Sequence, residues 1–249
     1  WPPEVGAQME KLRRQAIEDM QGDDEALGRF EYWTYAFDEF LNEWKEYATV
    51  FDVPRLKGVA VDGKDGDWAD KGLRVDALLD ATGAAKPVPG LEPSFRLGWD
   101  EKGLLVRAQV KAADFREAGK DDPLFKGDCL ELFLNRRVGQ TDRVRIVVAP
   151  GLDLQQPELR AWTQDFRETS ALKTIPVSAE TQRAKVDGGY LLEARLPWAM
   201  VGLEPKAGLE AGFQIQATRK QPDGKLTRAT WHPQMDGWPH GYHRIRLTE

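Results

Sequence analysis

The sequence predicts a mainly β protein: an antiparallel two-sheet β-sandwich, jelly-roll-like, preceded by an N-terminal helical hairpin. Apolar residues at helical spacing are confined to residues 1–52. Over residues 53–249, short alternating stretches are separated by Gly, Pro, Asp and Asn, which is the pattern of an all-β domain. About a dozen such stretches fit two packed sheets. We therefore expect two unequal parts, a helical segment and a sandwich.

The composition limits the partners of the chain. Its 249 residues are enough for a well-buried core. The formal net charge of −6 and the absence of a Lys/Arg cluster argue against nucleic acid or another polyanion, which basic patches normally bind. Mean hydropathy is −0.56, and no apolar run approaches the roughly 18 residues of a membrane helix, so we expect no membrane insertion.

The N-terminal segment has two stretches with helical periodicity, separated by the turn Gly22-Asp23-Asp24. The apolar positions of the first are Met9, Leu12, Ala16, Ile17 and Met20, and those of the second are Leu27, Phe30, Trp33, Phe37, Phe40, Leu41, Trp44 and Ala48. The second stripe is strongly aromatic and needs a partner. We expect it to pack on the other helix, on the sandwich or on a neighbouring domain; a ligand-binding aromatic box is the alternative.

The β part contains twelve candidate strands. They are residues 57–61, 95–99, 104–111, 129–136, 144–149, 159–164, 174–179, 182–186, 190–196, 213–219, 226–231 and 243–247. Turn signals such as Asp187-Gly188-Gly189 and Pro222-Asp223-Gly224 stand where hairpins need them. A short helix over residues 198–203 follows Pro197, because proline suits the first position of a helix.

The single cysteine, Cys129, excludes an intramolecular disulfide and a cysteine-based zinc site. Its place in an alternating strand predicts a buried apolar side chain rather than a nucleophile. The chain begins at Trp1 rather than Met, so we expect that a preceding segment has been removed.

Three phrases of the β part carry a family resemblance. They are Gly127-Asp128-Cys129-Leu130-Glu131-Leu132-Phe133-Leu134, then Gly189 to Trp198, then Thr230-Trp231-His232-Pro233 running on to Trp238. In this order and spacing they resemble the family 9 carbohydrate-binding modules, non-catalytic β-sandwiches of the DOMON-like superfamily. Val61-Asp62-Gly63 with Asp67-Trp68 is similar to the family's first strand. The resemblance covers residues 53–249.

The resemblance implies a sugar held between two aromatic faces. Trp238 matches the second tryptophan of the family, whereas Phe125 stands where the first is expected, which puts reducing-end specificity in doubt. This chemistry is sensible in itself, because a pyranose has a C–H face that packs on a flat ring. The alternative is that Trp238 only covers the mouth of the sandwich.

Polar side chains are implied for the sugar hydroxyls, because carboxylates accept and arginine donates bidentate hydrogen bonds. The implied ligand residues are Asp128, Glu131 and either Arg143 or Arg145, with His240 beside Trp238. In the alternative reading, Asp128 closes a turn and Glu131 pairs with Arg145.

An acidic loop is the candidate metal site. Asp62, Asp65 and Asp67 stand close together, and the resemblance implies structural calcium as a cofactor. Calcium takes 6–8 oxygen ligands, and the spacing is not that of an EF-hand. We favour an ordinary acidic turn, with calcium as the alternative. The three histidines, His232, His240 and His243, lack the spacing of a zinc site.

Catalysis is not expected. Asp128 and Glu131, at i and i+3 on one strand, point to opposite faces of a regular pleat and so do not form a glycosidase pair. We therefore predict a non-catalytic module that binds a polysaccharide or oligosaccharide, an appendage of a larger, secreted, periplasmic or cell-surface protein with a catalytic domain. The alternatives are a haem-binding electron-transfer domain, using Met200 or Met235 with a histidine, and an interaction domain that has lost sugar binding.

Overall fold

The computed structural model divides the chain into two compact units, Trp1–Val50 and Phe51–Glu249. The residues that the structure describes are 3–32, 34, 49–82, 86–112, 115–119, 121–136, 138, 142–151, 157–165, 173–232 and 242–249. We predicted the boundary after residue 52.

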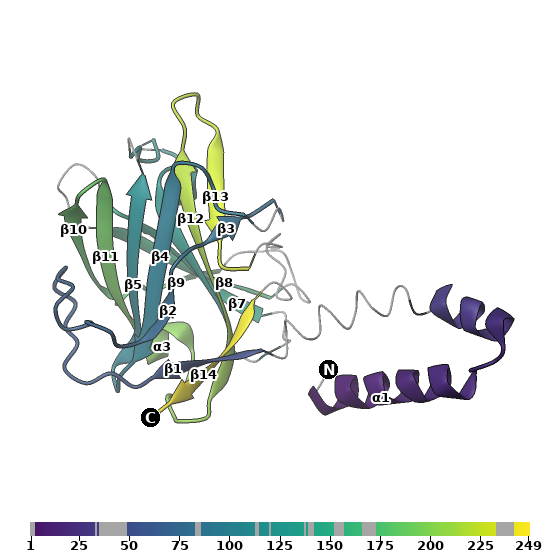
Figure 1. The fold of residues 1–249 in the computed structure, drawn as a ribbon. Helices are drawn as coiled ribbons and strands as arrows, with labels where there is room; N and C mark the ends of the chain where they lie inside the picture. Colours follow the sequence, from purple (N-terminus) through teal and green to yellow (C-terminus); the bar gives the residue numbers. More distant parts are fainter. Residues whose placement is uncertain are drawn as a thin grey trace. The chain divides into compact units, whose positions relative to one another are not determined.

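The first unit is helical (Figure 1). Helix α1 spans Pro3–Asp19 and so begins before the first residue of the predicted apolar stripe. Gly22 follows with a φ of 96°, a left-handed conformation that glycine adopts without strain. The Asp23 carboxylate accepts a hydrogen bond from the backbone N–H of Ala26 at 3.0 Å and caps the next helical stretch, residues 24–32. No helix in these described residues is both long and apolar enough to cross a membrane.

The aromatic stripe predicted for the second helix falls mostly outside the described residues. Its positions there are Trp33, Phe37, Phe40, Leu41, Trp44 and Ala48. What this stripe packs against therefore stays a prediction.

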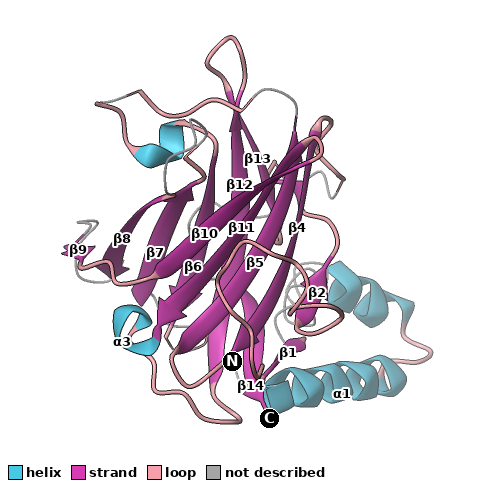
Figure 2. Cartoon of the chain, turned by 90° about the vertical axis from the view of Figure 1, so that its left-hand side faces the viewer, coloured by secondary structure: helices cyan, strands magenta, loops and turns pink. Residues whose placement is uncertain are grey.

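The second unit is an antiparallel two-sheet sandwich, as predicted (Figures 1 and 2). In the larger sheet the order is β1 (Val50–Pro54), β14 (His243–Thr248), β12 (Glu210–Lys220), β6 (Cys129–Asn135), β7 (Asp142–Ala149), β8 (Glu158–Asp165) and β9 (Lys173–Ile175), with β13 (Leu226–Thr230) paired to β12 and β3 (Leu79–Asp80) to β13. The smaller sheet has the order β10 (Glu180–Val186), β11 (Gly189–Pro197), β5 (Gly103–Ala112), β4 (Leu91–Trp99) and β2 (Leu73–Val75). We call them the nine-stranded and the five-stranded sheet.

The core lies between the two inner faces. Alternate residues of each strand enter it, as the two-residue period requires; in β6 these are Leu130, Leu132 and Leu134. Phe95 of the five-stranded sheet meets Trp231 across the interface, with ring centroids 5.2 Å apart in an edge-on arrangement. Each fully buried side chain of this size stabilises the fold by roughly 1.5–3 kcal/mol. The core therefore fixes which residues face outward.

Two short elements connect strands at the ends of the sandwich. The 3₁₀ turn η1 (Leu124–Lys126) leads into β6, and helix α3 (Trp198–Val201) follows Pro197 as predicted. Gly202 ends α3 with a φ of 68°. Most predicted strands are confirmed to within a few residues, but β2 and β3 are too short to show alternation in the sequence.

The strand predicted at residues 57–61 is wrong. Residues 55–72 instead form a loop that packs on the outer face of the five-stranded sheet, where Trp68 is buried against Leu105. The N–H groups of Arg55 and Leu56 still donate to the strand residues Thr248 and Trp99. Over residues 59–63, side chains hold the backbone rather than a neighbouring strand. The Asp67 carboxylate accepts from the N–H of Ala60 at 2.6 Å, and buried Glu193 accepts from the N–H of Gly63 at 2.8 Å. Alternating apolar and polar residues therefore do not form a strand where side chains take the hydrogen bonds of the backbone N–H groups.

His243 lies in an aromatic cluster beside this core. Its ring centroid is 4.2 Å from that of Trp231 and 5.1 Å from that of Phe51. Burial, with a smaller contribution from the neighbouring charge of His232, lowers the pKa of His243 to about 4. The folded protein therefore holds this imidazole neutral.

This shift predicts a loss of stability in acid. Because the unfolded chain binds the His243 proton near pH 6.5 and the folded chain only near pH 4, the stabilisation is complete above pH 6.5 and falls as the pH drops toward 4. The loss should reach roughly 2–4 kcal/mol. His243→Phe should flatten this slope in urea unfolding measured between pH 4 and 7. An unchanged slope in the variant would contradict the assignment.

Candidate functional site

The outer face of the nine-stranded sheet carries buried polar side chains. Since Leu130, Leu132 and Leu134 enter the core, Glu131 and Phe133 of β6 point to the opposite face. The neighbouring strands place Arg143 and Arg145 of β7 and Gln214, Gln216 and Thr218 of β12 on the same face. Buried polar groups need hydrogen-bond partners, so these residues must satisfy one another or a ligand.

Glu131 is the centre of this group. It is 2% exposed, and strand register sets Gln216 directly opposite it. Gln216 Nε2 donates to Oε1 at 2.6 Å, while Arg145 Nε donates to Oε2 at 2.9 Å. Thr218 Oγ1 also lies 3.5 Å from Oε1. Side chains from the two strands on either side of β6 thus hold one carboxylate, which forms an ion pair with Arg145.

Aromatic rings surround the Arg145 guanidinium. Its central carbon lies 4.6 Å from the ring centroid of Phe125, 5.8 Å from that of Phe133 and 6.0 Å from that of Trp162. Trp162 of β8 stands opposite Arg145 in register. Cation–π contacts of this kind fix the planar guanidinium in place. The structure therefore brings three predicted site residues together, namely Phe125, Glu131 and Arg145.

Arg143 lies farther along the same face. Its guanidinium is 5.3 Å from the ring centroid of Phe133, and its Nη1 donates to the hydroxyl oxygen of Tyr242 at 3.4 Å. Burial raises the pKa of Tyr242, which stays a neutral phenol. Arg143 and Arg145 both face outward, because they stand two residues apart on β7.

These side chains form the floor of a cleft of about 650 Å³. Its walls are the end of β3 and the hairpin that leads into β13. The lining residues are Asp80, Ala81, Thr82, Glu131, Phe133, Arg143, Arg145, Gln216, Lys225, Leu226, Thr227 and Arg228. This volume is in the range of small-molecule binding sites.

Asp128 is engaged by the backbone rather than placed in the cleft. Its Oδ1 accepts from the N–H of Lys220 at 2.8 Å, and its Oδ2 accepts from the N–H of Arg116. Burial is the main influence and raises the pKa of this carboxyl. Gly127 is needed beside it, because a Cβ there would overlap the backbone nitrogen of Ala118. The Gly-Asp pair thus ties residues 116–118 and the end of β12 to the start of β6.

Comparison with known proteins places the chain in a family. The model of the carbohydrate family 9 binding domain-like family matches residues 61–243, most of the chain. The chain belongs to this family. Comparison with curated proteins finds no match.

Solved structures support the same fold for the family 9 domain described here. A family 9 carbohydrate-binding module from Caldicellulosiruptor kristjanssonii in complex with cellotriose is similar at a TM-score of 0.57 and 16% identity, over 80% of this chain and 94% of that one. The same organism's module in complex with glucose gives 0.55 and 16%, over 79% and 95%. A carbohydrate-binding protein from Bacteroides uniformis, described as putative, gives 0.57 and 12%, over 80% and 100%.

The remaining predicted ligand residues of the family 9 domain, Trp238 and His240, lie outside the described residues. Sequence reasoning missed Gln216, Thr218 and Trp162. A signal for the first two was present, since Gln214-Ile215-Gln216-Ala217-Thr218 alternates neutral polar residues with apolar ones and so gives a buried strand a polar outer face.

In the acidic loop, the carboxylates of Asp62, Asp65 and Asp67 each have a separate hydrogen-bond or ion-pair partner. Asp62 accepts from the N–H of Lys64 at 2.9 Å, Asp65 pairs with Arg107 at 2.7 Å, and Asp67 accepts from the N–H of Ala60. Among the described residues, no group of three or more His, Cys, Asp or Glu side chains could hold a metal ion. These residues fit an acidic turn better than a calcium site, and calcium binding stays a prediction.

The other candidate ligands have structural surroundings. Cys129 is fully buried, and burial raises the pKa of its thiol, which confirms the prediction of an inert side chain. Met200 is 8% exposed and packs in the main core, which gives no support to a role as an axial ligand of haem. Met235 lies outside the described residues.

Replacing Asp128 tests its structural role. Asp128→Ala should lower the free energy of unfolding by roughly 2–4 kcal/mol, because two backbone N–H groups lose a charged acceptor. Asp128→Asn should lose less, since one amide oxygen remains. Urea unfolding measures both, with exposed Glu92→Ala in β4 as the control, expected within about 0.5 kcal/mol of the native chain. Unchanged stability in Asp128→Ala would contradict the structural role assigned to the Asp128 carboxylate.

Proposed function

We propose that the chain is a non-catalytic carbohydrate-binding module that binds a polysaccharide or oligosaccharide in the cleft on the outer face of the nine-stranded sheet. The observation that carries the proposal is the buried network of Glu131, Arg145 and Gln216 at the floor of this cleft. Family membership and the sugar complexes of two similar structures support it.

The floor has the chemistry that vicinal hydroxyls require. A sugar hydroxyl is both a donor and an acceptor, so it binds best where the two kinds of group stand side by side. Glu131 supplies carboxylate lone pairs, and Arg145 and Gln216 supply N–H groups, all within one strand spacing of one another. Because these groups already hold each other in place, little side-chain freedom is lost when a sugar binds.

The apolar face of the sugar needs an aromatic platform. We assign this role to Phe125 and Trp238, as the family resemblance implies. Phe125 and Trp162 both lie near the Arg145 guanidinium, with ring centroids 4.6 and 6.0 Å from its central carbon. A phenylalanine offers less area than a tryptophan and no ring N–H, so the platform at Phe125 is weaker than in relatives with tryptophan there.

The carboxylates support binding without catalysis. A retaining glycosidase needs two carboxyl groups about 5–5.5 Å apart that flank the scissile bond, and an inverting one needs a somewhat wider separation. Here Asp128 is bound to two backbone N–H groups and does not line the cleft. Both oxygens of Glu131 are engaged, by Arg145 and by Gln216, so this carboxylate is not free to complete such a pair.

The module is proposed as an appendage of a larger carbohydrate-active protein outside the cytoplasm: secreted, periplasmic or at the cell surface. Tethering raises the local concentration of a catalytic domain on its substrate. In this proposal the helical segment packs against a neighbouring domain or the sandwich.

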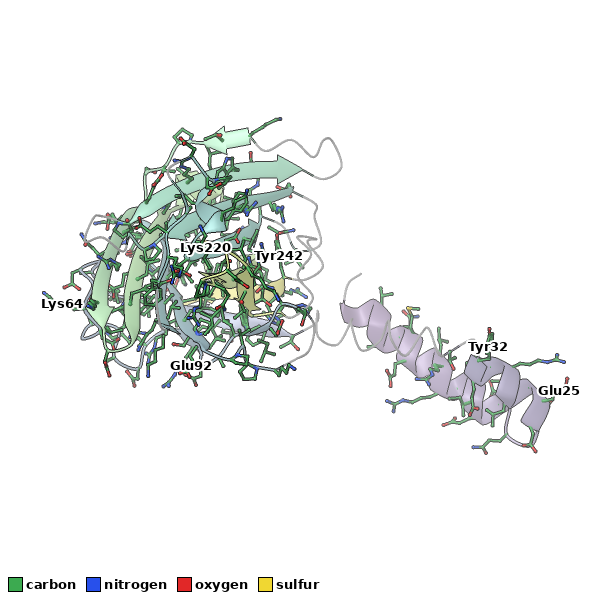
Figure 3. The ribbon with its side chains drawn as sticks, turned by 90° about the horizontal axis from the view of Figure 1, so that it is seen from above. Glu25, Tyr32, Lys64, Glu92, Lys220 and Tyr242 are labelled. Carbon is green, nitrogen blue, oxygen red and sulfur yellow. The ribbon has the colours of Figure 1, made fainter. Side chains whose placement is uncertain are left out.

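Sugar titration tests the proposal. Calorimetry with glucose and cellotriose should show saturable binding to the native chain, and Trp238→Ala should weaken it roughly tenfold, which corresponds to about 1.4 kcal/mol for the loss of one stacked ring. Tyr32→Ala is a matched aromatic control, since Tyr32 is 83% exposed and belongs to the helical unit (Figure 3). It should leave the affinity unchanged.

Two results would contradict the proposed function. One is the absence of binding to every sugar of a broad glycan panel, which would favour an interaction domain without a sugar site. The other is binding that survives both Trp238→Ala and Gln216→Leu, because the sugar would then lie elsewhere on the molecule.

A further inference from the structure

The cleft has a charge opposite to that of the chain. The formal net charge of the chain is −6. Among the described residues that line the cleft, four are cationic (Arg143, Arg145, Lys225 and Arg228) and only two are acidic (Asp80 and Glu131). The Glu131–Arg145 pair is neutral as a unit. The remaining lining groups leave the cleft positive.

Two of these cations stand on the wall formed by β13. Arg228 lies within β13, opposite Thr218 of β12, and Lys225 lies in the turn just before the strand. Both residues are exposed, and neither forms an ion pair with a described residue. Because no described carboxylate neutralises these two cations, their charge is available to a ligand in the cleft.

The wall that carries them is fixed. The turn is closed by the N–H of Gln221, which donates to the carbonyl oxygen of Lys225 at 2.8 Å. On its other side β13 pairs with β3, and the N–H of Ala81 donates to the carbonyl oxygen of Arg228 at 3.2 Å. The backbone of both cations is thus held at a set distance from the floor.

That distance suits one sugar ring. Glu131 and Arg228 lie on strands two steps apart, β6 and β13 with β12 between them. Neighbouring strands are about 4.8 Å apart and each residue advances about 3.3 Å, so the Glu131 and Arg228 backbones, offset by two residues in register, are separated by roughly 12 Å. A ring whose hydroxyls meet Glu131 and Gln216 therefore directs a substituent on its far side toward Arg228. Lys225, three residues earlier on the same wall, lines the same cleft farther along it.

We infer that the cleft selects sugars that carry an anionic substituent, a uronate carboxylate or a sulfate ester, with Lys225 and Arg228 as the residues that determine this specificity. The inference rests on the proposed function. Both anions take charge-assisted hydrogen bonds from lysine and arginine. Asp80 on the same wall accepts from the N–H of Thr82 at 2.8 Å, which engages one of its oxygens.

The overall charge restricts the ligand further. A chain with net charge −6 is repelled by a dense polyanion. The cleft instead suits a glycan in which acidic residues are spaced among neutral ones. The inference therefore concerns a single anionic group on the bound ring, not a heparin-like surface.

The test compares sugars that differ only in charge. Calorimetry at low ionic strength would use cellotriose against C6-oxidised cellotriose, and glucose against glucuronic acid and glucose 6-sulfate. The native chain should bind an acidic member of each set roughly five- to tenfold more tightly than the neutral one, and the ratio should fall as salt is added. The arm with the larger ratio identifies carboxylate or sulfate.

Variants assign the effect to the wall. The double substitution Lys225→Gln with Arg228→Gln should bring the acidic-to-neutral affinity ratio close to one. Lys64→Gln removes an equally exposed cation at the outer edge of the sandwich and should leave the ratio unchanged (Figure 3).

The outcomes separate this inference from the proposed function. Equal affinity of the native chain for acidic and neutral sugars would overturn the inference and leave the proposed function standing. A preference that survives the double substitution would also overturn the assignment to these residues. Binding of neither kind of sugar would overturn both.

Discussion

The site depends on one buried carboxylate. Glu131 is almost inaccessible to water, yet Arg145, Gln216 and Thr218 from the strands on either side of β6 satisfy both of its oxygens. Removing a charge from water costs several kcal/mol, which only close and complete hydrogen bonding offsets. The positions of its neighbours on the outer face follow from this requirement. An apolar residue at position 131 would leave the polar side chains around it without their hydrogen-bond acceptor.

The network in turn requires correct strand register. A slip of one residue would turn Glu131 into the core and Leu132 outward. The Gly127-Asp128 pair helps to prevent this, because it binds the start of β6 both to the 116–118 segment and to the end of β12. Asp128, which resembles a ligand residue in the sequence, therefore supports Glu131 of the cleft floor, three residues further along the chain.

The sequence predicts the fold much better than the site. Strong alternation located the long strands, from β4 to β14, because burial on one face alone forces that pattern. The two-residue period also puts Arg143 and Arg145 on one face of their strand. The sequence could not separate the role of Asp128 from that of Glu131, since both are acids beside a strand and only the partners of their oxygens differ. The strand predicted at residues 57–61 was wrong, because the alternation there comes from a loop that packs its apolar side chains on a sheet.

The sequence alone could not predict that Gln216 faces Glu131 and Trp162 faces Arg145. These contacts depend on the register between strands that are far apart in the chain. Neutral polar residues in an apolar strand were nevertheless a usable signal. Where charged residues and buried amides share a face, a polar network on that face is the simplest explanation.

The loop of residues 55–72 has a consequence for valency. By packing Trp68 on the outer face of the five-stranded sheet, it covers much of one of the two surfaces that a sandwich could present. In the described part of the chain, the cleft proposed to bind sugar is on the other surface. If the proposed function holds, this module engages a glycan chain through that one face, and firm attachment to an insoluble polysaccharide would come from repetition, through tandem copies or neighbouring modules that raise the effective concentration.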